Sequence, residues 1–451
     1  MNYSALFQQG DYRKHHIGLI GANGGFGYTF LAQLPLMRSS LDLRVVCDLD
    51  ITKSEQFLIS LGYDGDKICP CRNAEDVSRA PRDGIIVLDD FHLLPLCGID
   101  ALVEATGNPE VGAEVSEACL LAGIHVCEVS KESCSVSGAY LFGLAKKNGV
   151  VFTLVNGDQP ANLIDLLSWV ETLGLEVIAA GKSSEYDYVY DLENGTFTYR
   201  GKSEVIKEFK DEWDYQGTET LARRSAILSR YPQQAVPDYC EMGLVADATG
   251  LVPSCGRFHY PICRVSELAD IYIPQEDGGV LEKTGVVDVF NNLRRPDEAS
   301  FAGGVFVIVR CHDPKVWDII QEKGHVVGKN GKYACIYLPY HYMGVEAPMT
   351  VLLACRLGLS SNVMYRNATC MAGRTRRPFR KGEVLSLNGQ HRVVDDVDVS
   401  LVLRKDISPD VAPYYLFANK KLVADVPAGV LITTDMIELS GSSLFRMFGK
   451  S

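Results

Sequence analysis

The 451-residue chain lacks any apolar run that approaches the roughly 20 residues needed to span a bilayer as a helix. Its first residues, MNYSALFQQGDYRKHH, also lack the apolar core of a signal peptide. We therefore expect a protein that neither crosses a membrane nor is secreted, and that acts in the cytoplasm.

Positive charge is scarce as well. The chain has 44 Lys and Arg against 57 Asp and Glu, which gives a formal net charge of −13. Because a protein that neutralises the phosphates of nucleic acid needs a basic face, a nucleic-acid partner is not expected. The one dense basic run, GRTRRPFRKG at 373–382, is better explained as a solvated linker than as an anion site.

Metal-binding motifs are missing too. The CPC stretch at 69–71 is spaced too closely for a zinc knuckle and has no second pair, and no HExxH or EF-hand pattern occurs. The 14 cysteines are scattered, and many lie in apolar stretches, which is typical of reduced, buried thiols. The sequence therefore assigns no metal ligand, and a divalent metal is left open without residues to support it.

Apolar residues make up 47% of the chain, enough to form the cores of two or three domains. In the first third, short β-branched runs alternate with helix-like segments. The predicted strands are 17–20, 43–47, 85–88, 101–104, 124–128 and 150–154, and the predicted helices are 24–37, 52–61, 111–122 and 137–148. This alternation predicts βαβ units that build a parallel sheet.

The composition changes at about residue 156 and again after residue 359. The middle region has longer elements and more aromatic residues, and the last region is polar and rich in strand-like runs. We therefore predict an α/β protein with a Rossmann domain at 1–155, a mixed α/β catalytic and dimerisation domain at 156–359, and a small β-rich domain at 360–451. A homodimer or a higher homo-oligomer is expected.

The stretch HIGLIGANGGFGYTFLAQL at 16–34 follows the first predicted strand and opens the first predicted helix. Glycines spaced as GxxGxxG let the backbone approach a pyrophosphate, and the helix N-terminus offers free N–H groups to that anion. A tight structural turn is the alternative. The candidate cofactor contacts in this loop are Gly21, Asn23, Gly24, Gly25, Phe26 and Gly27.

Two further segments fit a dinucleotide. Asp48 ends the second strand about 20 residues after the loop, where a carboxylate binds ribose hydroxyls and repels a 2′-phosphate. NAD is therefore favoured over NADP, and Asp50 is an alternative for the same role. The stretch ATGNPEVGA follows the fourth predicted strand, and its small residues Ala105, Thr106 and Gly107 leave room for the nicotinamide ribose.

These segments resemble those of homoserine-dehydrogenase-like oxidoreductases, in which GIHVCEVSK places Lys131 at a lysine of that family. The whole chain is more similar to the members with a C-terminal SAF domain, the 1-deoxy-D-xylulose 5-phosphate reductoisomerase-like proteins. The matching stretches between 17 and 359 are ATGNPEVGAE, NGDQP, LGLEVIAAGK, EMGLVADATGLVP, IPQEDGGVLEKTGVVDV, GGVFVIV and PYHYMGVEAPMTV. The stretches FRKGEVL and VPAGVLITTDMI resemble the two halves of a SAF domain.

The resemblance implies an NAD(P)-dependent oxidoreductase that acts on a small polar hydroxy or keto substrate, such as a polyol or a sugar derivative. Its sharpest form is a reductoisomerase of the deoxyxylulose phosphate type. One alternative is a plain dehydrogenase of a homoserine-like or sugar-derived alcohol, and another is a non-catalytic, cofactor-bound sensor or assembly protein. The chain departs from its relatives in a longer glycine loop and in KSSEYDYV after 181.

Hydride transfer to a carbonyl builds an alkoxide, which needs a cation or a proton donor beside it. The best candidates are Lys182, at the end of LEVIAAGK, and Lys283, in GGVLEKTGVVDV, and Lys131 can serve in the same way. For each, a solvated surface lysine is the alternative. Asp158 in NGDQPAN is either an acid of the site or the N-cap of the helix that follows.

Three residues are candidate substrate contacts: His341, Glu346 and Glu241. His341 is either an acid or phosphate contact or a packed histidine between two tyrosines, and Glu346 approaches it across PYHYMGVE. Glu241 shares a predicted helix with Asp247, but their spacing does not put both on one face.

The stretch GKSSEYDYVYD adds Glu185, Asp187 and Asp191, and the tyrosines Tyr186, Tyr188 and Tyr190, after Lys182. Carboxylates near that lysine repel a dianionic phosphate, and tyrosines suit an uncharged chain with hydroxyls. We therefore predict that deoxyxylulose 5-phosphate is a poor substrate and that a less anionic polyol or hydroxy acid is better. The alternative is that these side chains point to solvent.

Overall fold

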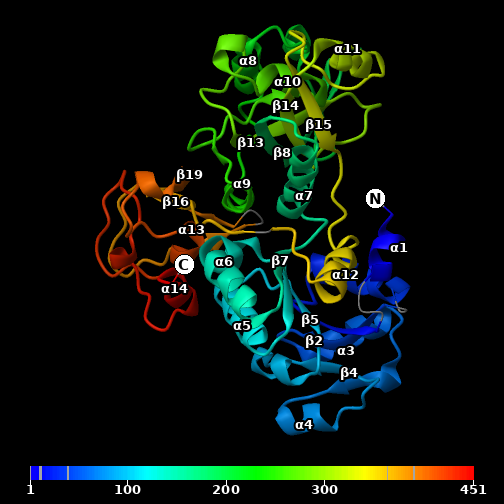
Figure 1. Cartoon of the computed structure of the whole chain (residues 1–451). Helices are drawn as coiled ribbons and strands as arrows, with labels where there is room; N and C mark the ends of the chain where they lie inside the picture. Colours follow the sequence, from blue (N-terminus) through cyan, green and yellow to red (C-terminus); the bar gives the residue numbers. More distant parts are fainter. Residues whose placement is uncertain (1, 10–12, 38–39, 363, 390–391, 451) are drawn as a thin grey trace.

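The computed structural model describes residues 2–9, 13–37, 40–362, 364–389 and 392–450. Figure 1 shows three parts: a Rossmann domain at the bottom, a catalytic domain at the top, and a C-terminal domain beside the region where they meet. The predicted α/β class is confirmed. Within the described part of the chain, no helix is long and apolar enough to cross a membrane.

The Rossmann domain is built on a parallel sheet of seven strands in the order β3-β4-β2-β1-β5-β6-β7. The strands are β1 (His15–Ile20), β2 (Leu41–Cys47), β3 (Ile68–Pro70), β4 (Ile85–Leu88), β5 (Ala101–Glu104), β6 (His125–Glu128) and β7 (Phe152–Leu154). The strand order reverses at β1, so the carboxyl ends of β1 and its neighbours form the crevice in which such sheets bind ligands.

The helices of this domain are α1 (Tyr3–Leu6), α2 (Gly25–Gln33), α3 (Ile51–Ser60), α4 (Ala74–Arg79), α5 (Pro109–Leu121) and α6 (Lys131–Asn148). The sequence analysis missed β3 and α4, which are only three and six residues long. The helix predicted at 24–37 becomes a 3-10 turn after Gln33, where Pro35 cannot donate a backbone hydrogen bond. The helix predicted at 137–148 begins earlier, at Lys131.

The catalytic domain contains a mixed sheet of eight strands. They are β8 (Val177–Asp191), β9 (Thr196–Tyr199), β10 (Lys202–Val205), β11 (Val252–Pro253), β12 (Ile262–Cys263), β13 (Val286–Arg294), β14 (Val305–Arg310) and β15 (Tyr333–Leu338). Central strand β8 runs parallel to β13 and antiparallel to β14. It does not end at Lys182, as predicted, but continues for nine more residues to Asp191.

The remaining helices of the middle region are α7 (Gln159–Thr172), α8 (Thr218–Ile227), α9 (Val236–Thr249), α10 (Leu268–Ile271), α11 (Pro314–Glu322) and α12 (Ala347–Leu357). Helix α7 packs on β8 and β14, and α9 packs on β13 and on α6 of the Rossmann domain. We predicted α12 as part of the catalytic domain, but Val351 and Ala354 pack in the same apolar core as Ile17 and Phe30 of the Rossmann domain.

The C-terminal domain has two small antiparallel sheets, β16 (Thr369–Thr375) with β19 (Val397–Leu403) and β17 (Leu387–Asn388) with β18 (Val393–Val394). It also has helices α13 (Tyr414–Phe417) and α14 (Ser443–Phe448), and α14 packs on α5 and α6. Ion pairs from Lys420 to Glu110 (2.6 Å) and from Arg446 to Glu117 (2.5 Å) fix this contact. The C-terminal domain is therefore docked on the Rossmann domain.

The largest apolar core belongs to no single domain. One continuous cluster of buried side chains contains Leu120 and Leu141 of the Rossmann domain, Val245 and Val289 of the catalytic domain, and Leu416 of the C-terminal domain. The three domains therefore share buried apolar surface where they meet.

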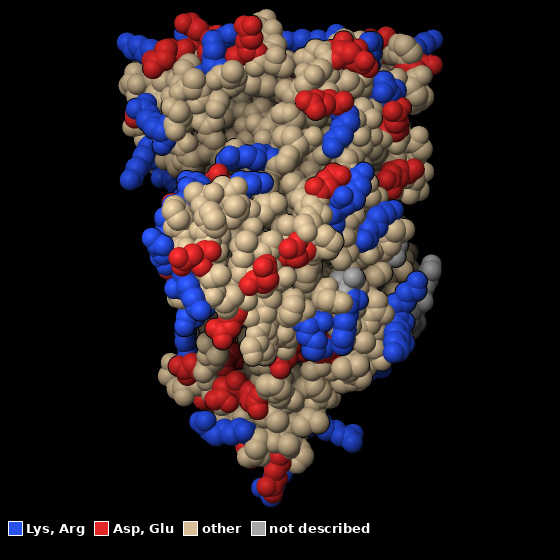
Figure 2. Space-filling view, turned by 90° about the vertical axis from the view of Figure 1, so that its left-hand side faces the viewer, with Lys and Arg blue, Asp and Glu red and all other residues tan. Residues whose placement is uncertain are grey.

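The basic run at 373–382 begins inside strand β16, so it is not the linker that the sequence analysis expected. Its arginines face carboxylates: Arg377 pairs with Glu383 (2.9 Å) and Asp396 (3.0 Å), and Arg380 pairs with Asp425 (3.2 Å). On the face of the molecule drawn in Figure 2, positive and negative side chains are interspersed. The run therefore adds little uncompensated positive charge.

Candidate active site

The glycine loop between β1 and α2 has two positions where only glycine fits. Gly21 has a φ of +85°, and a Cβ there would lie 2.4 Å from the carbonyl oxygen of Ala105. A Cβ on Gly27 would lie 2.2 Å from the carbonyl oxygen of Ala22. A Cβ on Gly25, in contrast, would meet no atom within 4 Å, so the space above the start of α2 is open.

The N-terminus of α2 has free backbone donors toward that open space. Gly24 is its N-cap and supplies no side-chain hydrogen bond. Unpaired N–H groups and the positive end of the helix dipole favour an anion such as a pyrophosphate. Phe26 contributes no side chain to this surface, because its ring is buried and stacks on Phe30. The loop therefore fits a dinucleotide through its backbone.

Asp48, at the end of β2, holds the glycine loop in place. Its two carboxylate oxygens accept hydrogen bonds from the backbone N–H groups of Asn23 (2.8 Å) and Leu49 (2.7 Å). The Asn23 side chain turns away, toward Ser54 (3.2 Å). Asp50 is the N-cap of α3 and accepts from the N–H of Lys53, so it is committed to that helix. Both acids therefore accept backbone hydrogen bonds, and of the two it is Asp48 that contacts the glycine loop.

The loop after β5 forms the other wall of the cofactor crevice. The Thr106 hydroxyl donates to Glu104 below it (2.5 Å), and the N–H of Gly107 donates to the Ser130 hydroxyl (2.7 Å). Arg392 of the C-terminal domain covers Gly107 and donates to its carbonyl oxygen. The backbone of Ala105 and Thr106 therefore lies against Gly21 of the glycine loop, and Arg392 of the C-terminal domain lies against Gly107.

Two buried glutamates beneath this loop were missed in the sequence. Glu104 and Glu128 end the adjacent strands β5 and β6 and lie opposite each other in the register. Burial raises the pKa of both carboxyl groups, and the charge of Glu104 raises the pKa of Glu128 further. Ser116 and Ser133 donate hydrogen bonds to Glu128. The sequence does contain a signal for this pair, because two neighbouring apolar strands each end in a glutamate.

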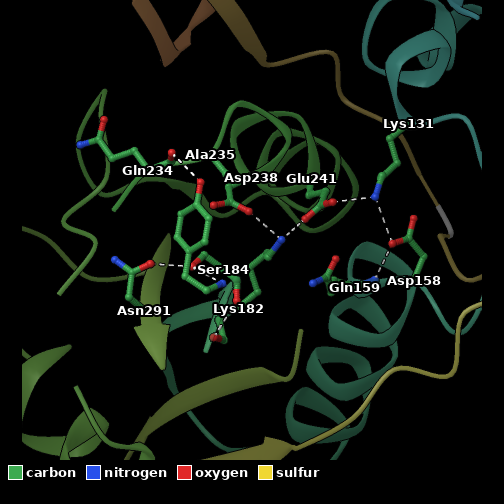
Figure 3. A network of polar contacts seen from close by, with 12 residues as sticks. Lys131, Asp158, Gln159, Lys182, Ser184, Gln234, Ala235, Asp238, Glu241 and Asn291 are labelled. Carbon is green, nitrogen blue, oxygen red and sulfur yellow. Dashed lines mark hydrogen bonds and ion pairs between the residues drawn. The ribbon is translucent and has the colours of Figure 1, made fainter. Parts of the chain in front are cut away.

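A cluster of lysines and carboxylates lies where α6 of the Rossmann domain meets α7, α9 and β8 (Figure 3). Lys131, the first residue of α6, donates from Nζ to Asp158 Oδ1 (3.2 Å) and to Glu241 Oε1 (2.6 Å). Lys182, on β8, donates to Asp238 Oδ1 (2.8 Å) and to the second oxygen of Glu241. Glu241 is therefore held between two ammonium groups.

The backbone explains how these residues meet. Asp238 and Glu241 are three residues apart on α9, so both carboxylates face the same side of the helix, toward β8. Asp158 caps α7 by accepting from the N–H of Gln159 (3.0 Å), so it is both an N-cap and a member of the cluster. Asp238 was not predicted as a site residue. The signal for it was its spacing of three residues from Glu241, which places two acids on one face of an otherwise apolar helix.

Asp247, which we compared with Glu241, lies elsewhere on α9. Its Oδ1 accepts from the N–H groups of Ala368 (2.8 Å) and Thr369 (2.9 Å) at the start of the C-terminal domain. It therefore ties that domain to α9 and takes no part in the cluster.

The two lysines differ in their access to solvent. The side chain of Lys182 is 1% exposed, whereas that of Lys131 is 22% exposed. Burial alone would lower the pKa of Lys131, but Asp158 and Glu241 raise it well above its usual range. Burial alone would raise the pKa of Glu241, but the two lysines lower it to about 2. Lys131 and Glu241 therefore form an ionised pair, and Lys131 is the accessible cation of the cluster.

His341 faces the same cluster. Its ring lies against Gly303, which has a φ of +80°, and a Cβ there would lie 2.5 Å from the ring. Desolvation lowers the pKa of His341, and the charged groups that act on it are those of Asp158, Lys182, Glu241 and Lys131. His341 is therefore a neutral imidazole beside the ion cluster.

We had expected Glu346 to approach His341, but no hydrogen bond between the described residues joins the two. Its carboxylate accepts from the N–H of Tyr342 (3.3 Å) and from Nδ2 of Asn162 (3.4 Å). Glu346 instead lines a hollow together with Asn156 and Asn162.

Lys283 does not join the cluster either. It lies on an exposed loop before β13, and none of the hydrogen bonds and ion pairs of the described residues involves it. The glycines around it shape this loop and do not close over the site. Lys182 was predicted to project from the end of a strand. In the structure, two carboxylates enclose it.

The stretch after Lys182 corrects a further expectation. Because β8 continues, its tyrosines alternate into an aromatic core and do not line a substrate pocket. That core contains Tyr186, Tyr188, Tyr190, Phe197, Phe209 and Trp213. Asp187 pairs with Arg294 (2.8 Å). The carboxylates that face Lys182 come from α9.

Among the described residues, no group of three His, Cys, Asp or Glu side chains is placed to hold a metal ion. In the cluster, the carboxylates of Asp158, Asp238 and Glu241 are turned toward ammonium groups. We therefore route no catalytic step through a metal.

Several solved structures are similar to parts of the chain. DOX-P reductoisomerase in complex with magnesium is 14% identical over 52% of this chain and 57% of its own, with a TM-score of 0.32. An inositol dehydrogenase homolog with NAD+ from Azotobacter vinelandii is 19% identical over 40% and 43%, with a TM-score of 0.27. The WlbA dehydrogenase from Bordetella pertussis, in complex with NADH and UDP-GlcNAcA, is 16% identical over 40% and 48%, with a TM-score of 0.27.

The chain thus spans about half the length of these structures. At TM-scores this low, the similarity alone supports no inference about its activity. No curated protein matches the chain in sequence.

The match to a protein family is more specific. Residues 157–347 match the model of the catalytic domain of the oxidoreductase DRL. This segment contains Asp158, Lys182, Asp238, Glu241 and His341, so it supplies every cluster residue except Lys131. The middle of the chain is therefore similar to an oxidoreductase catalytic domain of the DRL kind.

Proposed function

We propose that the chain is an NAD(P)-dependent oxidoreductase that reduces the carbonyl group of a small polar substrate, with Lys131 as the proton donor. The observation that carries this proposal is the placement of Lys131. It is the accessible cation of a buried ion cluster, and it begins α6 directly after β6, at the carboxyl edge of a sheet whose glycine loop fits a dinucleotide.

A bound nicotinamide cofactor would supply the hydride. The alkoxide that forms on the substrate oxygen needs a positive hydrogen-bond donor, and the Lys131 ammonium meets that need. Asp158 and Glu241 hold this ammonium in one position. Because the same two carboxylates keep Lys131 protonated, its ammonium form is the one that meets the substrate oxygen, as carbonyl reduction requires.

The charge of the cluster limits the substrate. Each of the two ammonium groups is already paired with two of the three acids of the cluster, and His341 is neutral. No cation of the cluster is left to neutralise a phosphate dianion. We therefore propose an unphosphorylated ketose, polyol-derived ketone or keto acid as the substrate. The proposed substrate class thus rests on the charged residues of the cluster and not on the tyrosines after Lys182.

The proposed function is tested by following NADH oxidation with a panel of unphosphorylated ketoses and keto acids, beside deoxyxylulose 5-phosphate. We expect turnover on members of the panel and little on the phosphate ester. Turnover on the phosphate ester alone would contradict the proposed substrate class. The absence of turnover on every compound, in both directions of the reaction, would contradict the proposed reductase activity.

The preference for NADH over NADPH is a separate prediction that rests on Asp48. Since like charges side by side cost a few kcal/mol, we expect NADH to bind on the order of a hundredfold more tightly than NADPH. Quenching of the protein fluorescence by each reduced cofactor gives both affinities. Asp48→Ser should reduce this preference, and Asp50→Asn, which keeps the cap of α3, should leave it unchanged. Equal affinities in the natural chain would contradict the role of Asp48.

A further inference from the structure

A cavity of about 550 Å³ lies between the Rossmann and catalytic domains, apart from the lysine–carboxylate cluster. In Figure 1 its surroundings are found on the right, where α1 and α12 lie next to each other beneath α7. The side chains that line it include Tyr3, Met37, Asp165, Leu166, Tyr340 and Met349. Its volume is that of a small-molecule site.

The cavity has a polar floor with negative charge. Asp165 is exposed to the cavity, and its Oδ2 accepts from Nδ2 of Asn156 (2.6 Å). Glu346 lines the same floor and accepts from Asn162. Among the described residues that line the cavity there is no lysine, arginine or histidine. Two carboxylates therefore face one space without a cation between them.

The electrostatics of Asp165 show that this charge is uncompensated. The surrounding protein desolvates the carboxyl group, and Glu346 repels its negative charge, so that its pKa is raised to about 6. The other titratable groups that line the cavity are the phenols of Tyr3, Tyr337 and Tyr340. A positive ligand between the two carboxylates would offset this repulsion.

The walls suit an organic cation better than a metal ion. Three tyrosines line the cavity together with Met37 and Met349, and aromatic faces attract ammonium groups. The two carboxylates fall short of a metal site, and no group of three ligating side chains occurs in the part of the chain that the structure describes. We propose that this cavity binds an amine: an ammonium group on a small apolar or aromatic body, with Asp165 and Glu346 as its counter-charges.

The amine site is distinct from the reaction site. His341 faces the lysine–carboxylate cluster, whereas Tyr340 and Glu346 of the same segment line the cavity. The glycine loop lies at the N-terminus of α2, whereas the cavity meets Gln33 at its other end, roughly 12 Å away for eight residues of helix. The amine site therefore stands whether or not the proposed reaction is correct.

Isothermal titration of the full chain with benzylammonium tests this site, with benzyl alcohol as the uncharged compound of similar shape. At about pH 8 we expect benzylammonium to bind at least tenfold more tightly than benzyl alcohol. Its affinity should fall as the pH falls through about 6, because protonation of Asp165 removes the counter-charge. Asp165→Asn should lower the affinity at least tenfold.

Two further variants complete the experiment. Glu346→Gln should also weaken binding, and it replaces Asp165→Asn if that variant does not fold. Asp64→Asn changes an exposed carboxylate in a different hollow of the Rossmann domain and should leave binding unchanged. Equal binding of benzyl alcohol, unchanged affinity in both cavity variants, or no heat at millimolar benzylammonium would each overturn the proposal.

Discussion

Replacing Lys131 with methionine should lower kcat for carbonyl reduction by about 10²- to 10⁴-fold, while NADH still binds. Methionine keeps the length of the side chain but removes the ammonium group that meets the substrate oxygen. Asp158 and Glu241 then face that oxygen with negative charge alone, which opposes the developing alkoxide. Steady-state kinetics on the substrate found in the panel, together with cofactor titration, measure both effects.

Two other variants identify what Lys131 supplies. Lys131→Arg keeps the positive charge but does not release a proton, because a guanidinium does not deprotonate in proteins. It should therefore recover part of the substrate affinity and little of kcat. Lys283→Met, on an exposed loop outside the cluster, should leave both constants unchanged. Full activity of Lys131→Met would show that the proton comes from another group.

Replacing Lys182 with methionine should cost about 3–5 kcal/mol of the free energy of unfolding, the usual effect of breaking a buried ion pair. Its ammonium group is almost fully buried between Asp238 and Glu241. Without it, Asp238 is a buried carboxylate whose remaining side-chain partner is the hydroxyl of Tyr260 (3.1 Å). Urea denaturation of the variant and the natural chain gives the difference.

A double variant separates the ion pair from simple loss of packing. Lys182→Met with Asp238→Leu removes both charges, so it should regain part of the stability that the single variant loses. Glu241 keeps Lys131 as a partner in that background. Lys283→Met should change stability by less than about 0.5 kcal/mol. A cost below about 1 kcal/mol for Lys182→Met would contradict the buried pair.

The parts predicted well from the sequence depend on local patterns. The six strands predicted in the Rossmann domain are all present, because β-branched runs bounded by turn residues specify strands with little help from the rest of the chain. The open glycine loop at Gly24 and Gly25 was found in the same way, since its context of strand, loop and helix lies within a few residues.

The parts predicted poorly depend on contacts between distant segments. Lys182 was interpreted as a catalytic lysine that projects from the end of a strand, because its partners, Asp238 and Glu241, lie 56 and 59 residues further along the chain. The tyrosines after it were interpreted as substrate contacts because β8 was predicted to end too early. Had Tyr186 been placed on a continuing strand, its alternation with Asp187 would have indicated a core face.

The apolar cluster that runs through all three domains determines how the protein loses its structure. Residues such as Val245 and Leu416 have their neighbours in more than one domain, so no domain can open without exposing apolar surface of the next. The chain thus passes from one domain to the next near 155 and 359, but we expect the three domains to unfold together. Heat should melt the chain in one step, with its calorimetric and van't Hoff enthalpies equal, as in a single domain.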